Sequence, residues 1–100
     1  MAEFVLGEYL AGQGCIILRT PTWDIDTFPE LAERLVRLLS ATVIEKQLDA
    51  DLHSWLIDFE GCPLLLRAEH YSGSIWIEAL SAQESEEELI FLAQLFARGI

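Results

Sequence analysis

The sequence predicts an α+β fold, a two-layer sandwich in which two amphipathic helices pack on one face of an antiparallel sheet of about four to five strands. Three consecutive segments within residues 52–80 alternate apolar and polar side chains, which is typical of half-buried strands. Two other segments, 27–39 and 81–98, repeat apolar side chains at helical spacing instead. The length of 100 residues is that of a single domain, 1–100.

The first segment, residues 4–10, is compatible with a strand or with a short helix, because Gly7 interrupts a weak alternation. Gly12 and Gly14 then indicate a turn, and the β-branched apolar run 15–19 indicates a strand. A hairpin is therefore favoured, with a short first helix as the alternative.

The first predicted helix starts at Thr27. Thr27 and Glu30 have the spacing of a capping box, in which each side chain satisfies a free backbone N–H of the first turn. Apolar residues follow at helical spacing up to about Ser40, and Glu33 and Arg37 form a favourable i,i+4 pair on the other face.

Further strands are predicted on either side of short turns. Their ranges are 43–48, 52–60, 62–71 and 74–80. Alternation in the last three places one set of side chains toward the helices: His53, Trp55, Ile57, Phe59, Leu64, Leu66, Ala68, His70, Ile75, Ile77 and Ala79. Ser72 and Gly73 predict a two-residue hairpin loop, which places Arg67 opposite Glu78 as a cross-strand ion pair.

The second predicted helix occupies the C-terminal segment. Ser81 and Glu84 have capping-box spacing, and several glutamates crowd the first turns, where the helix dipole favours negative charge. Gly99 suits the left-handed position that ends many helices.

The charge balance argues against two classes of partner. Seventeen acidic and six basic residues give a net charge of −11, whereas binding to nucleic acid or to an anionic membrane requires clustered lysine and arginine. The longest apolar runs have four residues, far short of a membrane span, and no signal peptide is recognisable at the N-terminus. We therefore expect a cytoplasmic protein in which Cys15 and Cys62 are free, buried thiols.

The outer face of the predicted sheet is unusually apolar for a surface in contact with water. The side chains that alternation places there, together with the predicted ion pair, are Leu56, Leu65, Arg67, Trp76, Glu78 and Leu80. One interpretation is that the segment around Trp23, or the N-terminus, folds over this face. The other is that the face binds protein, either as a homodimer or with a partner that has a basic surface.

Few residues in the sequence are candidates for a catalytic, metal or ligand site. His53 and His70 are expected on the inner face of neighbouring strands, where they are weak candidates for a metal or small-ligand site. A hydrogen-bonded histidine pair at the end of the sheet explains them as well, and Cys15 is read as a buried thiol without an adjacent base. We predict no catalytic residue, no cofactor and no metal, and enzyme activity is the less favoured interpretation.

Two resemblances extend this reading. Residues 69–72 (Glu-His-Tyr-Ser) and 76–80 (Trp-Ile-Glu-Ala-Leu), followed by an acidic helix, resemble a family of short uncharacterised gamma-proteobacterial proteins of unknown function. That resemblance implies a bacterial cytosolic protein and transfers no functional residue. The size, acidity and apolar face are also similar to class I secretion chaperones, which are small dimeric α+β proteins.

Overall fold

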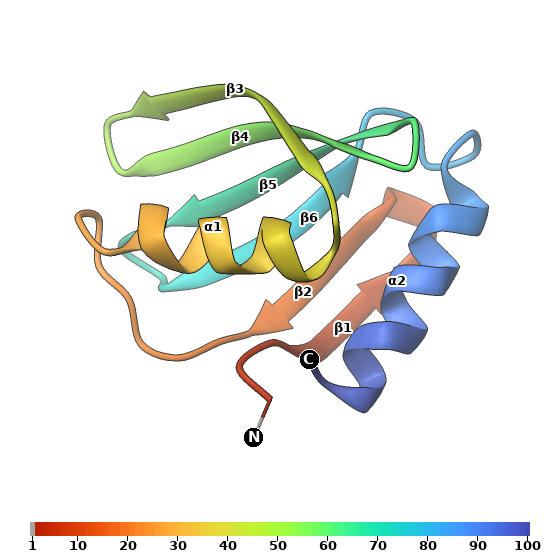
Figure 1. Cartoon of the computed structure of the whole chain (residues 1–100), viewed down its shortest axis with the longest axis horizontal. Helices are drawn as coiled ribbons and strands as arrows, with labels where there is room; N and C mark the ends of the chain where they lie inside the picture. The colour runs from red at the N-terminus through yellow and green to blue at the C-terminus, as the bar shows by residue number, and fades with distance from the viewer. Residues whose placement is uncertain (1) are drawn as a thin grey trace.

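A computed structural model describes residues 2–100 as a six-stranded sheet with two helices on one face (Figure 1). The elements along the chain are β1 (Val5–Leu10), the short 3-10 helix η1 (Ala11–Gln13), β2 (Cys15–Arg19), α1 (Phe28–Leu38), β3 (Thr42–Asp49), β4 (Leu52–Phe59), β5 (Cys62–Glu69), β6 (Ser74–Ala79) and α2 (Glu86–Arg98). Their order in the sheet is β1-β2-β6-β5-β4-β3, and all neighbours are antiparallel. The α+β class is confirmed, but the predicted count of four to five strands is too low.

The N-terminal hairpin accounts for the extra strands. Residues 5–10 form β1 and not a helix, and β2 pairs with β6, so the hairpin extends the sheet formed by β3 to β6. The register of β1 shifts between Leu6 and Glu8, so Gly7 lies at a bulge. A Cβ at Gly7 would come within 3.0 Å of the Ile17 carbonyl oxygen, which explains why glycine interrupts the alternation there.

Helix α1 connects β2 to β3, which is at the far edge of the sheet (Figure 1). The capping box predicted for Thr27 and Glu30 is wrong, because Thr27 exchanges hydrogen bonds with Asp24 and not with the first turn of the helix. The Asp24 carboxylate accepts hydrogen bonds from the backbone N–H groups of Asp26 and Thr27, and the Thr27 hydroxyl accepts one from the Asp24 N–H, each at 2.9 Å. The predicted Glu33–Arg37 pair is also absent from residues 2–100, since Glu33 instead pairs with Lys46 on β3.

Helix α2 begins at Glu86, five residues after the predicted start. The Ser81 hydroxyl does accept a hydrogen bond from the Glu84 N–H at 3.3 Å, but this bond closes a turn that precedes the helix. Three glutamates, residues 86–88, fill the first turn as expected. The helix lies along β1 and β2, and its end is tied back to the N-terminal segment by hydrogen bonds between Phe4 and Ile100.

The β5–β6 hairpin has a four-residue loop and not the predicted two-residue loop at Ser72 and Gly73. Glu69 pairs with Ser74, so the observed register differs by two residues from the predicted one. The Glu69 carboxylate accepts hydrogen bonds from both the backbone N–H and the hydroxyl of Ser72, and these bonds stabilise the longer loop. A shift of two residues keeps every side chain on its predicted face.

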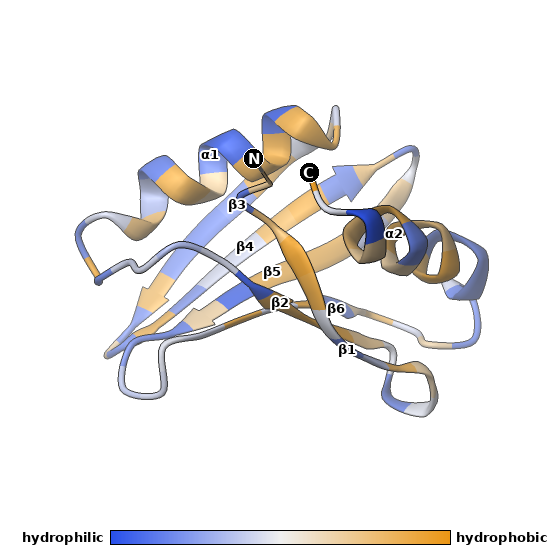
Figure 2. Cartoon of the chain, turned by 90° about the horizontal axis from the view of Figure 1, so that it is seen from below, coloured by the Kyte–Doolittle hydropathy of each residue, from blue (hydrophilic) through white to orange (hydrophobic). Residues whose placement is uncertain are grey.

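The core lies between the helices and the inner face of the sheet, because both helices lie on that one side of the sheet (Figure 2). The predicted inner-face residues of β4, β5 and β6 are buried there: His53, Trp55, Ile57, Phe59, Leu64, Leu66, Ala68, Ile75, Ile77 and Ala79. The exception is His70, which is exposed in the loop that follows β5. Within residues 2–100, no helix is long and apolar enough to cross a membrane.

Candidate functional site

The outer face of the sheet is left uncovered by the described chain, residues 2–100. Both helices lie on the other face (Figure 2). The two segments expected as possible covers also lie on the helix side. Trp23 packs against Phe28 with ring centroids 5.5 Å apart, and Phe4 is fully buried in the core. The interpretation that a loop or the N-terminus covers the outer face is therefore wrong.

The strand residues predicted for the interaction surface all lie on this outer face. Leu56 of β4 is directly opposite Leu65 of β5, and both are partly buried. Arg67 of β5 is opposite Trp76 of β6, and not opposite Glu78 as the predicted register required. Leu80, the sixth predicted residue, follows the end of β6 and is 60% exposed.

Three further apolar side chains, which the sequence reasoning missed, extend the patch across the sheet. Ile17 is directly opposite Trp76, and Cys15 pairs with both Leu10 and Glu78. Alternation in residues 15–19 predicts that Cys15 and Ile17 point to the same face of their strand, but only the pairing of β2 with β6 brings that face beside Trp76. Leu10 joins them through its pairing with Cys15. We use the name outer apolar patch for Leu10, Cys15, Ile17, Leu56, Leu65 and Trp76.

The two cysteines lie on opposite faces of the sheet, and both are free. Cys62 is buried, and its thiol is 3.3 Å from the Ser85 hydroxyl. The expectation that Cys15 is a buried thiol is wrong, because Cys15 is partly exposed in the outer apolar patch. Desolvation and then the nearby Glu78 carboxylate raise the pKa of Cys15, which lowers its thiolate fraction at neutral pH and therefore its reactivity.

The polar groups beside Trp76 hold the indole ring in place. The Trp76 Nε1–H donates a hydrogen bond to Glu78 Oε1 at 3.1 Å, and Arg67 Nη1 lies 3.5 Å from the same oxygen. Both charged side chains are about one-third exposed, at 33% and 35%. The only polar atom of the indole is therefore satisfied within the sheet, and the ring itself remains available for contact.

The outer face is strongly acidic around this patch. Six carboxylates and two guanidinium groups point to this side of the sheet, by the strand pairing and alternation: Glu8, Glu45, Asp49, Asp58, Glu69 and Glu78 against Arg19 and Arg67. One arginine is neutralised by Glu78. The patch therefore combines an apolar centre with a negative surround.

The two histidines are not placed together as predicted. His53 is 6% exposed, and its Nε2–H donates to the Ile25 carbonyl at 3.0 Å, since a carbonyl oxygen can only accept. Its ring packs on Phe28 with centroids 4.6 Å apart. His70 is exposed in the β5–β6 loop, with its ring against Trp23. Residues 2–100 contain no group of three or more His, Cys, Asp or Glu side chains arranged to hold a metal ion.

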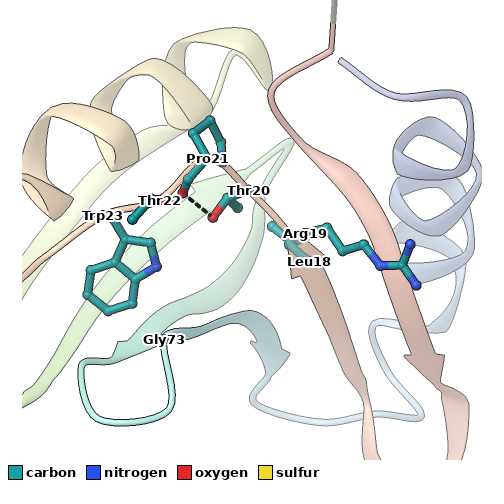
Figure 3. Close-up of a pocket in the computed structure, with 7 residues that line it drawn as sticks. All are labelled: Leu18, Arg19, Thr20, Pro21, Thr22, Trp23 and Gly73. Carbon is teal, nitrogen blue, oxygen red and sulfur yellow. Dashed lines mark hydrogen bonds between the residues drawn. The ribbon is translucent and has the colours of Figure 1, made fainter.

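A hollow of about 430 Å³ lies between the segment 20–23 and the β5–β6 loop at Gly73 (Figure 3). Trp23 forms one wall, and the Thr20 hydroxyl donates a hydrogen bond to the Pro21 carbonyl. Arg19 is the only charged side chain in its lining, and Figure 3 shows that it points away from Trp23 toward β1. The lining of this hollow includes two threonine hydroxyls but no carboxylate, imidazole or thiol beside them that could act as a base.

Comparison with known proteins identifies the family. The family model described as "Protein of unknown function (DUF3630)" matches residues 4–97, and the chain therefore belongs to that family. No curated protein and no solved structure matches the chain.

Proposed function

We propose that this protein is an interaction module that binds a protein partner through the outer apolar patch. The observation that carries the proposal is a set of apolar side chains on a sheet face over which no described element lies. Leu10, Cys15, Ile17 and Trp76 are neighbours on β1, β2 and β6, and Leu65 and Leu56 lie on the other side of the Arg67–Glu78 ion pair. Apolar patches of this kind on soluble proteins often mark binding sites. Trp76 is at its centre, and tryptophan is among the residue types that contribute most to binding energy.

The charge around the patch favours one kind of partner over the other. In a homodimer formed face to face, the carboxylates around one patch would lie close to those of the second copy, and like charges across an interface are unfavourable. A partner with basic residues around an apolar contact would meet opposite charge instead. We therefore favour a different protein with a basic surface over a second copy of this chain.

The cytoplasm is the compartment we propose, and a bacterial origin of gamma-proteobacterial type is the expectation from the sequence resemblance. The two free cysteines support the compartment, because thiols stay reduced in the cytoplasm. A secretion-chaperone role would be a special case in which the partner is a secreted protein.

Site-specific crosslinking tests the proposal in cells. A photo-crosslinking amino acid replaces Leu65 on the outer face, and the control replaces Leu38, which is 53% exposed on α1. We expect a crosslink from position 65 to one protein, identified by mass spectrometry, and none to that protein from position 38. When the same crosslinking is repeated in a cell extract, the crosslink should weaken as salt rises, because charge complementarity is screened.

Two charge substitutions supply the matched comparison. Trp76→Glu should abolish the crosslink from position 65 with little change in the circular dichroism spectrum, whereas Leu38→Glu should leave the crosslink intact. Crosslinks that join only two copies of the chain would overturn the proposed partner in favour of a homodimer. Unfolding caused by Trp76→Glu, or equal crosslinking from both positions, would show that the outer face is not the binding surface.

A further inference from the structure

A hollow of about 350 Å³ lies beside Trp76 on the outer face. Its floor and walls are apolar where Leu10, Ile17 and Trp76 line it. Glu69 and Ser72, from the β5–β6 hairpin, line its polar end. The hollow thus runs from the outer apolar patch to a single charged group.

The carboxylate at the polar end is held in place before any partner arrives. Glu69 Oε2 accepts hydrogen bonds from the Ser72 backbone N–H at 2.6 Å and from the Ser72 hydroxyl at 2.7 Å. The backbone N–H of Ser72 is the largest of the effects that lower the pKa of Glu69, so this group is ionised at neutral pH. A fixed anion has little conformational freedom left to lose on binding.

No lysine or arginine pairs with Glu69 within the described chain, and the charge of the adjacent His70 is the last of the effects that lower its pKa. The ion pairs of residues 2–100 join Arg34 to Glu3, Lys46 to Glu33 and Arg67 to Glu78. Arg67 is on the same strand as Glu69 but pairs with Glu78, which also accepts the hydrogen bond from the indole of Trp76. Glu69 is thus a preformed anion that no lysine or arginine of residues 2–100 pairs with, at the end of an apolar hollow.

This combination suits one kind of side chain. Arginine carries its charge at the end of an aliphatic stem, and its stem packs on apolar surface while its head pairs with a carboxylate. Its planar guanidinium also stacks on indole rings. A wholly apolar side chain would fill the floor but would desolvate Glu69 without a compensating partner, which is unfavourable.

Building on the proposed function, we propose that the hollow beside Trp76 receives an arginine side chain of the protein partner. The aliphatic stem lies on Ile17 and Trp76, and the guanidinium pairs with Glu69. The hollow would then provide specificity within the larger apolar contact, since it selects a partner whose binding segment presents an arginine.

A titration followed by NMR tests this without knowledge of the partner. The probe is Nα-acetyl-arginine methylamide, and its neutral isostere Nα-acetyl-citrulline methylamide is the control. We expect saturable shifts of the Trp76 indole and Ser72 amide signals with the arginine probe, and affinity about tenfold lower for citrulline, which lacks the charge. Glu69→Gln should lower affinity for the arginine probe by a similar factor, whereas Glu45→Gln, the same change elsewhere on this face, should not.

Equal responses to the arginine and citrulline probes would overturn the inference, and so would unchanged arginine affinity in Glu69→Gln. The comparison of the two probes on the unmodified protein remains decisive if a variant folds poorly. The proposed function is judged separately by the crosslink from position 65. If that crosslink persists undiminished in Glu69→Gln, the arginine pocket is wrong while the interaction surface stands.

Discussion

The two tryptophans on opposite faces of the sheet provide the sharpest test of the architecture. Trp55 of β4 is 2% exposed, packs edge-to-face on Phe28 with centroids 5.7 Å apart, and has the Lys46 ammonium 4.3 Å from its ring centroid. Trp76 of β6 is partly buried on the uncovered face. Replacing each by alanine removes the same atoms from two different environments.

The expected costs differ because only one site is enclosed. Trp55→Ala removes a buried ring and leaves a cavity that the surrounding helices and strands fill only in part, so it should cost about 3–5 kcal/mol. Trp76→Ala also loses apolar burial, but the space it leaves opens to water and adds no cavity term, which suggests about 1–2 kcal/mol. The difference between the two variants should therefore be about 2–3 kcal/mol.

Urea unfolding followed by far-UV circular dichroism measures this difference, because tryptophan fluorescence would change with the substitution itself. With a slope of about 1.5 kcal/mol per molar urea, the midpoint should fall by about 2–3 M for Trp55→Ala and by about 1 M for Trp76→Ala. If Trp76→Ala proves as costly as Trp55→Ala, the outer face is enclosed in solution, and the reasoning behind the interaction surface fails.

Three further predictions concern single groups. Hydrogen bonds from backbone N–H groups lower the pKa of Asp24, so its stabilisation is present above about pH 4 and is lost as pH falls through the folded-state pKa. Asp24→Asn should therefore lower the thermal midpoint at pH 7, and its difference from the unmodified protein should shrink steadily as pH falls below about 4; a difference that stays constant with pH would contradict this. His53→Ala should lower the free energy of unfolding by about 2 kcal/mol or more in chemical denaturation, because it leaves a cavity and an unpaired carbonyl. His70→Ala should change it by less than about 0.5 kcal/mol, because that side chain is exposed. Similar costs for the two variants would contradict the placement of His53 in the core and His70 at the surface. Gly14→Ala should destabilise more than Gly73→Ala, since both have positive φ but only Gly14 lacks space for a Cβ, and thermal melts that rank them in the opposite order would refute the packing around Gly14.

Local patterns in the sequence predicted the faces of the strands well and their partners poorly. Alternation placed Trp55 and Ile77 inside and Trp76 outside, because a strand's side chains point to opposite faces whatever its neighbour is. The pairing of Arg67 was wrong by two residues, because it depends on the length of the β5–β6 loop. That length follows from the contacts of Glu69 with Ser72, which a two-residue turn signal does not anticipate.

Sequence periodicity predicted the α+β class, the two helices and the apolar character of one outward strand face, since each of these depends on the pattern along a single segment. Tertiary structure alone decided that β2 joins β6, that α1 crosses to the far edge of the sheet, and that nothing in the described chain covers Trp76. It also decided that Glu69 and Ile17, 52 positions apart in number, line one hollow. Such neighbours depend on which strands pair, and pairing is a property of the whole sheet and not of any one segment.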